Sequence, residues 1–105
     1  MSMQKKPYSI DELQRLIKPI AVRYGVERVF LFGSYAQSST TPDSDIDLRI
    51  DRGAINDYFE LSGFHQDLEN ALMSSVDVLT TGSLDSKFLS RIKNEEIILY
   101  EQSKH

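Results

Sequence analysis

Three aspartates and one Gly-Ser pair are the residues of this sequence whose types and spacing suit chemistry. Asp45 and Asp47 stand two residues apart in an alternating segment, Asp77 lies in a later apolar run, and Gly33-Ser34 directly follows another apolar run. Residues two apart on a strand point to the same face, so the carboxylates of Asp45 and Asp47, with Cα atoms about 6.6 Å apart, can converge on cations. Such hard oxygen ligands favour Mg²⁺ or Mn²⁺ over zinc, and the chain has no cysteine.

Asp77 extends this arrangement to a third carboxylate. An unpaired charge in an apolar strand is costly, so we expect Asp77 to have a strong partner, either metal ions shared with Asp45 and Asp47 or a cation such as Arg49. Three carboxylates around two Mg²⁺ ions about 3.5 to 4 Å apart would clamp the attacking and leaving oxygens of an in-line displacement at phosphorus. The pattern predicts a magnesium-dependent enzyme of nucleotide transfer.

The Gly-Ser pair predicts where the phosphates of the nucleotide bind. Gly33 has no side chain to keep a phosphate away from the backbone. Ser34 adds a hydroxyl and a backbone N–H at an expected turn or helix start, where anions are favoured. The phosphates would therefore lie beside the metal ions.

The same residues also have plainer interpretations. An Asp-x-Asp pattern by itself is more often part of a solvated edge strand than of a metal site. Arg49 shares the strand face of Asp45 and Asp47, where it could face solvent, pair with Asp77 or contact a phosphate.

Other polar and aromatic residues are expected to be structural. His65 falls on a polar helix face and is interpreted as a structural histidine. The aromatic cluster of Tyr58, Phe59 and Phe64 is predicted to belong to the core and not to a ligand site.

Apolar periodicity predicts the elements that position these residues. Ser9 and Glu12 form a capping-box pattern before a helix that ends at Gly25. A second helix is expected between Ile55 and Met73, and a last one around residues 84–92. Short apolar or alternating runs predict strands at 29–32, 45–50, 76–79 and, with a helix tail as the alternative, 97–100.

The order of these elements predicts an α/β (α+β) fold, a small mixed sheet with helices packed against it. The short link between the first two strands favours an antiparallel pair, because parallel strands need a longer crossover. A length of 105 residues suits a single domain spanning 1–105, with no room for a separate substrate-binding domain.

Composition narrows the class of protein. The net charge of -4 argues against broad, sequence-independent binding to nucleic acid. No long apolar segment follows the two lysines near the N-terminus, so we expect a cytoplasmic protein without membrane contact. The lack of cysteine excludes disulfides and thiolate metal sites.

A family resemblance covers most of the chain. Residues 32–36 (Phe-Gly-Ser-Tyr-Ala), followed by 45–48 (Asp-Ile-Asp-Leu) with ten residues between Ser34 and Asp45, resemble the signature of the minimal nucleotidyltransferases of the DNA polymerase beta superfamily. Residues 76–79 resemble the third-carboxylate strand of that family, and residues 98–101 resemble its closing segment. The resemblance implies the polymerase-beta-like nucleotidyltransferase fold.

The resemblance also implies roles for the site residues. Asp45 and Asp47 would bind both Mg²⁺ ions, and Asp77 would bind one and help to activate the acceptor hydroxyl. Gly33 and Ser34 would hold the triphosphate of ATP. Members of this size are often encoded beside a HEPN-type partner, a helical RNase, and act as its antitoxin. The resemblance implies transfer of AMP from ATP to a tyrosine hydroxyl of that toxin.

The sequence departs from the family pattern just after the signature. Gln37 and Ser38 stand where arginine and glycine are common, and Arg49 is a candidate substitute for the phosphate contact.

Two other functions stay open. One is a non-catalytic module that neutralises its partner by covering it, and the other is nucleotide transfer to a small molecule or an RNA end. The short length and acidic balance count against these last two acceptors.

Overall fold

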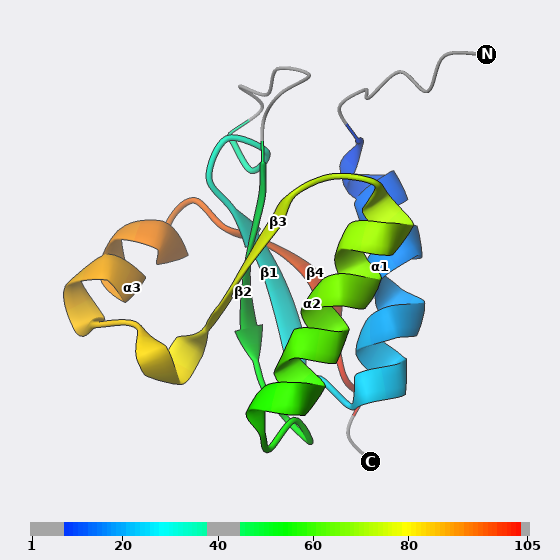
Figure 1. The fold of residues 1–105 in the computed structure, drawn as a ribbon. Helices are drawn as coiled ribbons and strands as arrows, with labels where there is room; N and C mark the ends of the chain where they lie inside the picture. The colour runs from blue at the N-terminus through cyan, green and yellow to red at the C-terminus, as the bar shows by residue number, and fades with distance from the viewer. Residues whose placement is uncertain (1–7, 38–44, 104–105) are drawn as a thin grey trace.

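A four-stranded mixed sheet forms the centre of the protein. The computed structural model describes residues 8–37 and 45–103, whose arrangement is shown in Figure 1. The strand order is β3-β2-β1-β4, with β1 antiparallel to both β2 and β4, and β2 parallel to β3. The predicted mixed sheet and antiparallel first pair are confirmed, and the last apolar run is a strand. The strands are β1 (Arg28–Phe32), β2 (Ile46–Asp51), β3 (Val76–Thr80) and β4 (Ile97–Glu101).

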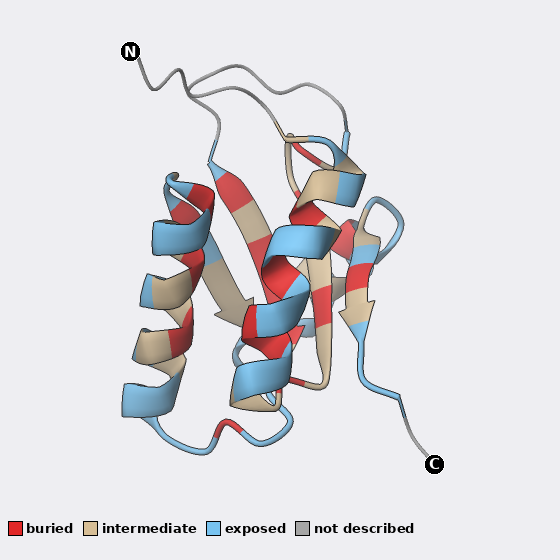
Figure 2. Ribbon diagram, turned by 90° about the vertical axis from the view of Figure 1, so that its right-hand side faces the viewer, coloured by how far each residue is buried: buried red, intermediate tan, exposed pale blue. Residues whose placement is uncertain are grey.

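Two long helices, α1 (Ile10–Tyr24) and α2 (Tyr58–Leu72), cover one face of this sheet. α1 begins at the predicted capping box, in which Ser9 Oγ accepts the Glu12 N–H at 3.1 Å and Glu12 Oε1 accepts the Ser9 N–H at 2.8 Å. It ends at Gly25, whose φ of 69° lies in the left-handed region. In Figure 2 the exposed residues of both helices, in pale blue, lie on their outer sides.

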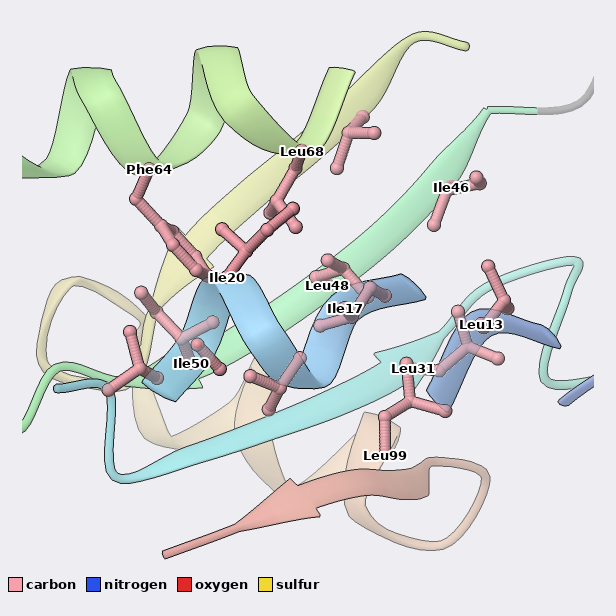
Figure 3. Close-up of a cluster of buried hydrophobic side chains, with 14 of the residues drawn as sticks. Leu13, Ile17, Ile20, Leu31, Ile46, Leu48, Ile50, Phe64, Leu68 and Leu99 are labelled. Atoms are coloured by element: carbon pink, nitrogen blue, oxygen red, sulfur yellow. The ribbon is translucent and has the colours of Figure 1, made fainter. Parts of the chain in front are cut away.

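The core lies between these two helices and the sheet. Leu31 and Leu48 are direct partners in the β1–β2 ladder, and they pack in one cluster with Leu13 and Ile17 of α1. All four side chains are fully buried, and each such burial contributes roughly 1.5 to 3 kcal/mol. Figure 3 shows the cluster, with Leu13, Ile17, Ile20, Leu31, Ile46, Leu48, Ile50, Phe64, Leu68 and Leu99 labelled.

The opposite face of the sheet is only partly covered. A short 3-10 turn, η1 (Thr81–Ser83), leads from β3 to α3 (Ser86–Lys93). Phe88 of α3 packs edge-on against Phe32 of β1, with ring centroids 6.1 Å apart. Figure 1 shows α3 on the other side of the sheet from α1 and α2. This partly covered face carries the polar residues of β2.

The aromatic cluster predicted for the core is divided between core and surface. Phe64 is fully buried, as predicted, whereas Tyr58 is 83% exposed and Phe59 is 90% exposed. The prediction for these two was wrong because they form the first turn of α2, six and five positions before Phe64. At about 100° per residue, that spacing turns them well away from the buried side of the helix.

Membrane-spanning helices are absent from the described ranges 8–37 and 45–103, because no helix there is both long and apolar enough.

Candidate active site

β2 divides its residues between the two faces of the sheet. Ile46, Leu48 and Ile50 are fully buried in the core beneath α1 and α2. Asp47 and Arg49 alternate with them and therefore point to the face that α3 partly covers. The alternation that the sequence predicted for this strand is confirmed.

The register of the sheet places Asp47 at the centre of the candidate site. Asp47 pairs with Phe32 of β1, the residue before Gly33, and with Asp77 of β3. Gly33 and Asp77 therefore flank Asp47 from two neighbouring strands. The carboxyl groups of Asp47 and Asp77 share a hydrogen bond. The fold thus brings together three of the residues singled out in the sequence, although they come from three separate segments.

Gly33 is required by its contact with Asp47. Its φ is 75°, a conformation that other residues rarely adopt. A β-carbon at this position would overlap Asp47 Oδ2 and lie 3.2 Å from Asp47 Cγ. The chain then turns through Ser34, and the Gln37 N–H donates to both the Gly33 and Ser34 carbonyls at 3.2 Å. The absent side chain therefore makes room for the central carboxylate.

The Asp47 carboxyl group holds its proton unusually tightly. Its pKa is raised from 3.8 to about 6, first because burial penalises the charged form, then because of the hydrogen bond with Asp77 and repulsion by Asp77 and Asp45. At neutral pH the group is therefore an anion crowded by other anions. A divalent cation would relieve that crowding.

Asp77 and Asp45 are both exposed, and neither is buried in the core. Asp77 was expected to need a strong partner because its strand is apolar. That reason does not hold, since β3 is an edge strand and Asp77 is exposed. Asp77 nevertheless has a partner in Asp47. Asp45 lies just before β2 and acts on Asp47 by charge repulsion, the smallest of the four causes of its raised pKa.

The residues present fit a hard divalent cation in part. In the described ranges, no group of three or more His, Asp or Glu side chains gathers closely enough to hold a metal ion. Asp47 and Asp77 do meet, and a cation between them would be bound by the oxygen ligands that Mg²⁺ prefers. The space that a Gly33 side chain would take is filled by the Asp47 carboxylate itself.

Arg49 is held inside the protein by Glu96. Only 4% of Arg49 is exposed, and its Nε and NH2 donate to the two carboxylate oxygens of Glu96 at 3.0 and 2.5 Å. NH1 donates to Thr81 Oγ1 at 2.7 Å, and Cζ lies 4.0 Å from the Phe30 ring centroid. Arg49 is therefore neither solvent-facing nor the partner of Asp77. Its predicted phosphate contact stays a prediction, and these bonds give it no support.

Two glutamates that the sequence reasoning did not single out tie the site to the turn before β4. Glu96 binds Arg49 of β2, and Glu95 accepts a hydrogen bond from the Gln37 side chain at the end of the Gly33 turn. The only sequence signal was a pair of acidic residues before an apolar strand. Ser38, the other departure from the family pattern, lies outside the described residues.

His65 has the structural role predicted for it. Its Nε2 lies 2.5 Å from the Val76 carbonyl oxygen, and the Val76 N–H donates to Glu69 Oε2 at 3.1 Å. Side chains of α2 thus make hydrogen bonds with both the N–H and the C=O of Val76, the first residue of β3.

Comparisons with known proteins agree with this geometry. A Methanocaldococcus jannaschii protein named as a candidate protein adenylyltransferase is 37% identical over 89 residues, which cover 85% of this chain and 96% of the relative. The solved structure of a toxin-antitoxin with AMP-PNP has a TM-score of 0.73 at 23% identity, covering 85% of this chain and 73% of that one.

A second solved structure has the same fold. It is a tri-AMPylated Shewanella oneidensis HEPN toxin in complex with an MNT antitoxin, with a TM-score of 0.67 at 20% identity, covering 89% of this chain and 73% of that one. The family model described as polymerase beta, nucleotidyltransferase, matches residues 15–105. With Gly33, Asp47 and Asp77 gathered on one face of the matching fold, the chain belongs to the polymerase beta nucleotidyltransferase family.

Proposed function

We propose that this protein is a magnesium-dependent protein adenylyltransferase that moves AMP from ATP to a hydroxyl, most simply a tyrosine hydroxyl, of a HEPN-family RNase and so acts as its antitoxin. The observation that carries the proposal is the position of the Asp47 carboxyl group, between the side-chain-free Gly33 and the carboxyl group of Asp77. A relative named for protein adenylylation and a similar structure of an AMPylated HEPN toxin with its antitoxin support the choice of reaction and acceptor.

The nucleotide would bind on the β1 side of the site. Gly33 allows the triphosphate to approach the backbone, and Ser34 offers donors in the turn that follows. The solved relative with AMP-PNP supports an adenine nucleotide as the donor. Arg49 is assigned no direct part, because Glu96 and Thr81 already bind its guanidinium group.

The carboxylates would hold Mg²⁺ and accept a proton. Asp47 and Asp77, with Asp45 completing the set, would bind two ions, and bound Mg²⁺ would neutralise charge on the transferring phosphoryl group. The acceptor hydroxyl oxygen forms a bond to the α-phosphorus as the bond from that phosphorus to the bridging oxygen breaks. Pyrophosphate leaves with that electron pair. Asp77, exposed on the edge strand, accepts the hydroxyl proton.

The proposal is tested by following AMP. The protein is incubated with α-labelled ATP, Mg²⁺ and the product of the neighbouring gene, which we expect to be a HEPN protein, and the products are separated on gels and weighed as intact proteins. Wild type should add one or more AMP units to the HEPN protein, and Asp45→Ala/Asp47→Ala should add none. Asp11→Ala, which removes an aspartate from the exposed surface of α1, is the matched control and should keep activity.

Other outcomes would select the remaining functions. Tight binding of the HEPN protein by wild type without any gain of AMP would contradict the proposed enzyme. It would favour a non-catalytic antitoxin that neutralises its partner by covering it. Label appearing on an RNA end or a small molecule, and not on protein, would move the proposed acceptor to that class.

A further inference from the structure

A pocket opens between α2 and the edge strand β3. Its volume is about 180 Å³, and it is lined by Tyr58, Leu61, Ser62, His65 and Val78. Val78 follows Asp77 in the strand, so its side chain lies on the opposite face of the sheet from the candidate active site. Only the thickness of one edge strand separates the pocket from Asp77.

Two adjacent exposed aromatic residues begin α2, and the first of them, Tyr58, lines this pocket. Tyr58 and Phe59 are 83% and 90% exposed in the first turn of α2. Two neighbouring exposed aromatic side chains form a larger apolar patch than scattered apolar residues do. Aromatic residues are also enriched in protein interfaces. Tyr58 therefore joins the pocket to this exposed pair, in which Phe59 is its neighbour in the chain.

The charged residues of α2 all have the same sign. α2 contains no lysine or arginine, and its acidic residues are Glu60, Asp67 and Glu69, preceded by its N-cap Asp57. Asp67 is paired with Arg23 of α1 at 3.2 Å. Asp57 and Glu60 are exposed and have no cationic partner among the described residues, although each accepts one backbone N–H at the start of α2. A partner suited to this surface carries an apolar side chain flanked by lysine or arginine.

The surface is fixed in place before any partner arrives. His65 lines the pocket and also contacts the Val76 carbonyl, while Glu69 accepts the Val76 N–H. These two bonds from α2 tie the helix to β3 on either side of the same residue. The free energy of binding a partner would therefore not include an entropic cost of ordering the pocket.

The direction of phosphoryl transfer places the acceptor at the β3 edge of the sheet. In an in-line displacement the attacking oxygen enters opposite the leaving pyrophosphate. The proposed triphosphate contact, Gly33, follows β1, whereas Asp77 lies in β3, with Asp47 of β2 between them. The acceptor must therefore approach past β3, which is the edge of the sheet. A protein that reaches Asp77 by this route meets the α2–β3 surface.

We propose that the acceptor protein docks on the surface formed by Tyr58, Phe59 and the α2–β3 pocket, with an apolar side chain in the pocket and basic residues against Asp57 and Glu60, while its hydroxyl reaches Asp77 around β3. The identity of the occupant as the acceptor rests on the proposed function. The docking surface itself is tested by binding, without any reaction.

The test measures the Kd of the HEPN protein by calorimetry in the absence of ATP. Tyr58→Ser/Phe59→Ser should weaken binding at least tenfold, and Ser62→Trp, which fills the pocket from an exposed position, should weaken it similarly. The matched control is Val22→Ser/Met73→Ser, which removes two other exposed apolar side chains, 56% and 62% exposed, outside this surface. It should bind within twofold of wild type.

Each contrary result has a distinct meaning. Unchanged affinity in both surface variants, or no binding of the HEPN protein by wild type, would overturn the docking proposal. A wild-type dimer that is lost in Tyr58→Ser/Phe59→Ser on sedimentation would assign the surface to a second copy of this chain instead. If wild type binds and the variants do not, but no AMP is ever transferred, the docking surface stands and the proposed function fails. The thermal shift produced by ATP and Mg²⁺ should be the same in the variants as in wild type.

Discussion

The carboxyl group of Asp47 lies where three negative charges meet. It is partly buried, hydrogen-bonded to Asp77 and repelled by Asp45, and its pKa is raised to about 6. A group whose folded-state pKa lies above its unfolded value favours folding while it is protonated. Ionising Asp47 therefore costs stability, and that cost grows as the pH rises from 3.8 to about 6.

Replacing Asp47 with asparagine should remove this cost. We expect Asp47→Asn to raise the melting temperature of metal-free protein above pH 6 and to have no stabilising effect below about pH 4. Because solvent screens this partly exposed group, the gain should be about 1 kcal/mol. Circular dichroism melts in EDTA at several pH values measure it. Equal melting temperatures of the two proteins at pH 8 would contradict the prediction.

Added Mg²⁺ provides the companion measurement. At pH 8 it should stabilise wild type by about 1.4 kcal/mol when present at tenfold its Kd, since it binds the folded state alone. The Asp47→Asn protein should gain much less, because the central ligand has lost its charge.

Gly33 gives a prediction with an internal control. Gly33→Ala places a β-carbon against the Asp47 carboxylate in a left-handed conformation, so we expect a loss of about 1 to 2 kcal/mol and at least tenfold weaker ATP binding. Gly82→Ala adds the same atom where nothing lies within 4 Å, and it should change both quantities little. Urea unfolding and nucleotide titration measure both. Similar losses in the two variants would show that the contact with Asp47 has no special role.

At the scale of elements, Arg49 and Glu96 join β2 to the turn between α3 and β4. The side chains of Arg49 and Glu96 are 5% and 7% exposed, so each charge depends on the other for its burial. Glu95 next to Glu96 binds Gln37, which links the same turn to the residues after Gly33. The turn before β4 thus holds two parts of the candidate site that are far apart in sequence.

Removing one partner of this buried pair should destabilise the protein far more than removing both. Glu96→Ala leaves the Arg49 charge buried without its main partner, and we expect a loss of about 3 to 5 kcal/mol. Arg49→Met/Glu96→Leu removes both charges and should lose far less. Glu101→Ala, which breaks the exposed pair with Arg28 at 3.0 Å, should cost under about 1 kcal/mol. Urea unfolding of the four proteins tests this, and equal losses for Glu96→Ala and Glu101→Ala would contradict it.

The sequence predicted elements better than it predicted partners. Strict alternation placed Asp47 and Arg49 on one face of β2, and this local pattern is confirmed. The partner of Arg49 could not be predicted, because Glu96 lies 47 residues away and only the packing of the turn before β4 brings it close. The exposure of Asp77 could not be predicted, because an apolar run does not show whether its strand lies inside a sheet or at its edge.

At the scale of the whole molecule, one shared core supports both the site and the proposed docking surface. The core cluster draws residues from α1, α2 and all four strands. α2 contributes Phe64 and Leu68 to it, while its first turn presents Tyr58 and Phe59 to solvent. Stability and recognition are therefore separated along one helix.

That separation predicts opposite outcomes for two phenylalanines five positions apart. Phe64→Ala should destabilise the protein by about 3 to 5 kcal/mol, because it opens a cavity in the core. Phe59→Ala removes a side chain that is 90% exposed and should change stability by less than about 0.5 kcal/mol. Chemical denaturation of both variants measures the difference. A large loss in Phe59→Ala would mean that its ring packs against the fold in solution.

The two bonds that α2 makes to Val76 have a consequence for the fate of the protein at high concentration. An edge strand with free N–H and C=O groups is a template on which another chain can add a strand, and repeated addition builds insoluble fibres. Glu69 and His65 already occupy both groups of Val76, and the next residue carries the charge of Asp77. The end of β3 beside Asp77 is thus closed to the addition of another strand. This limits aggregation at the edge of the sheet past which we propose that an acceptor approaches.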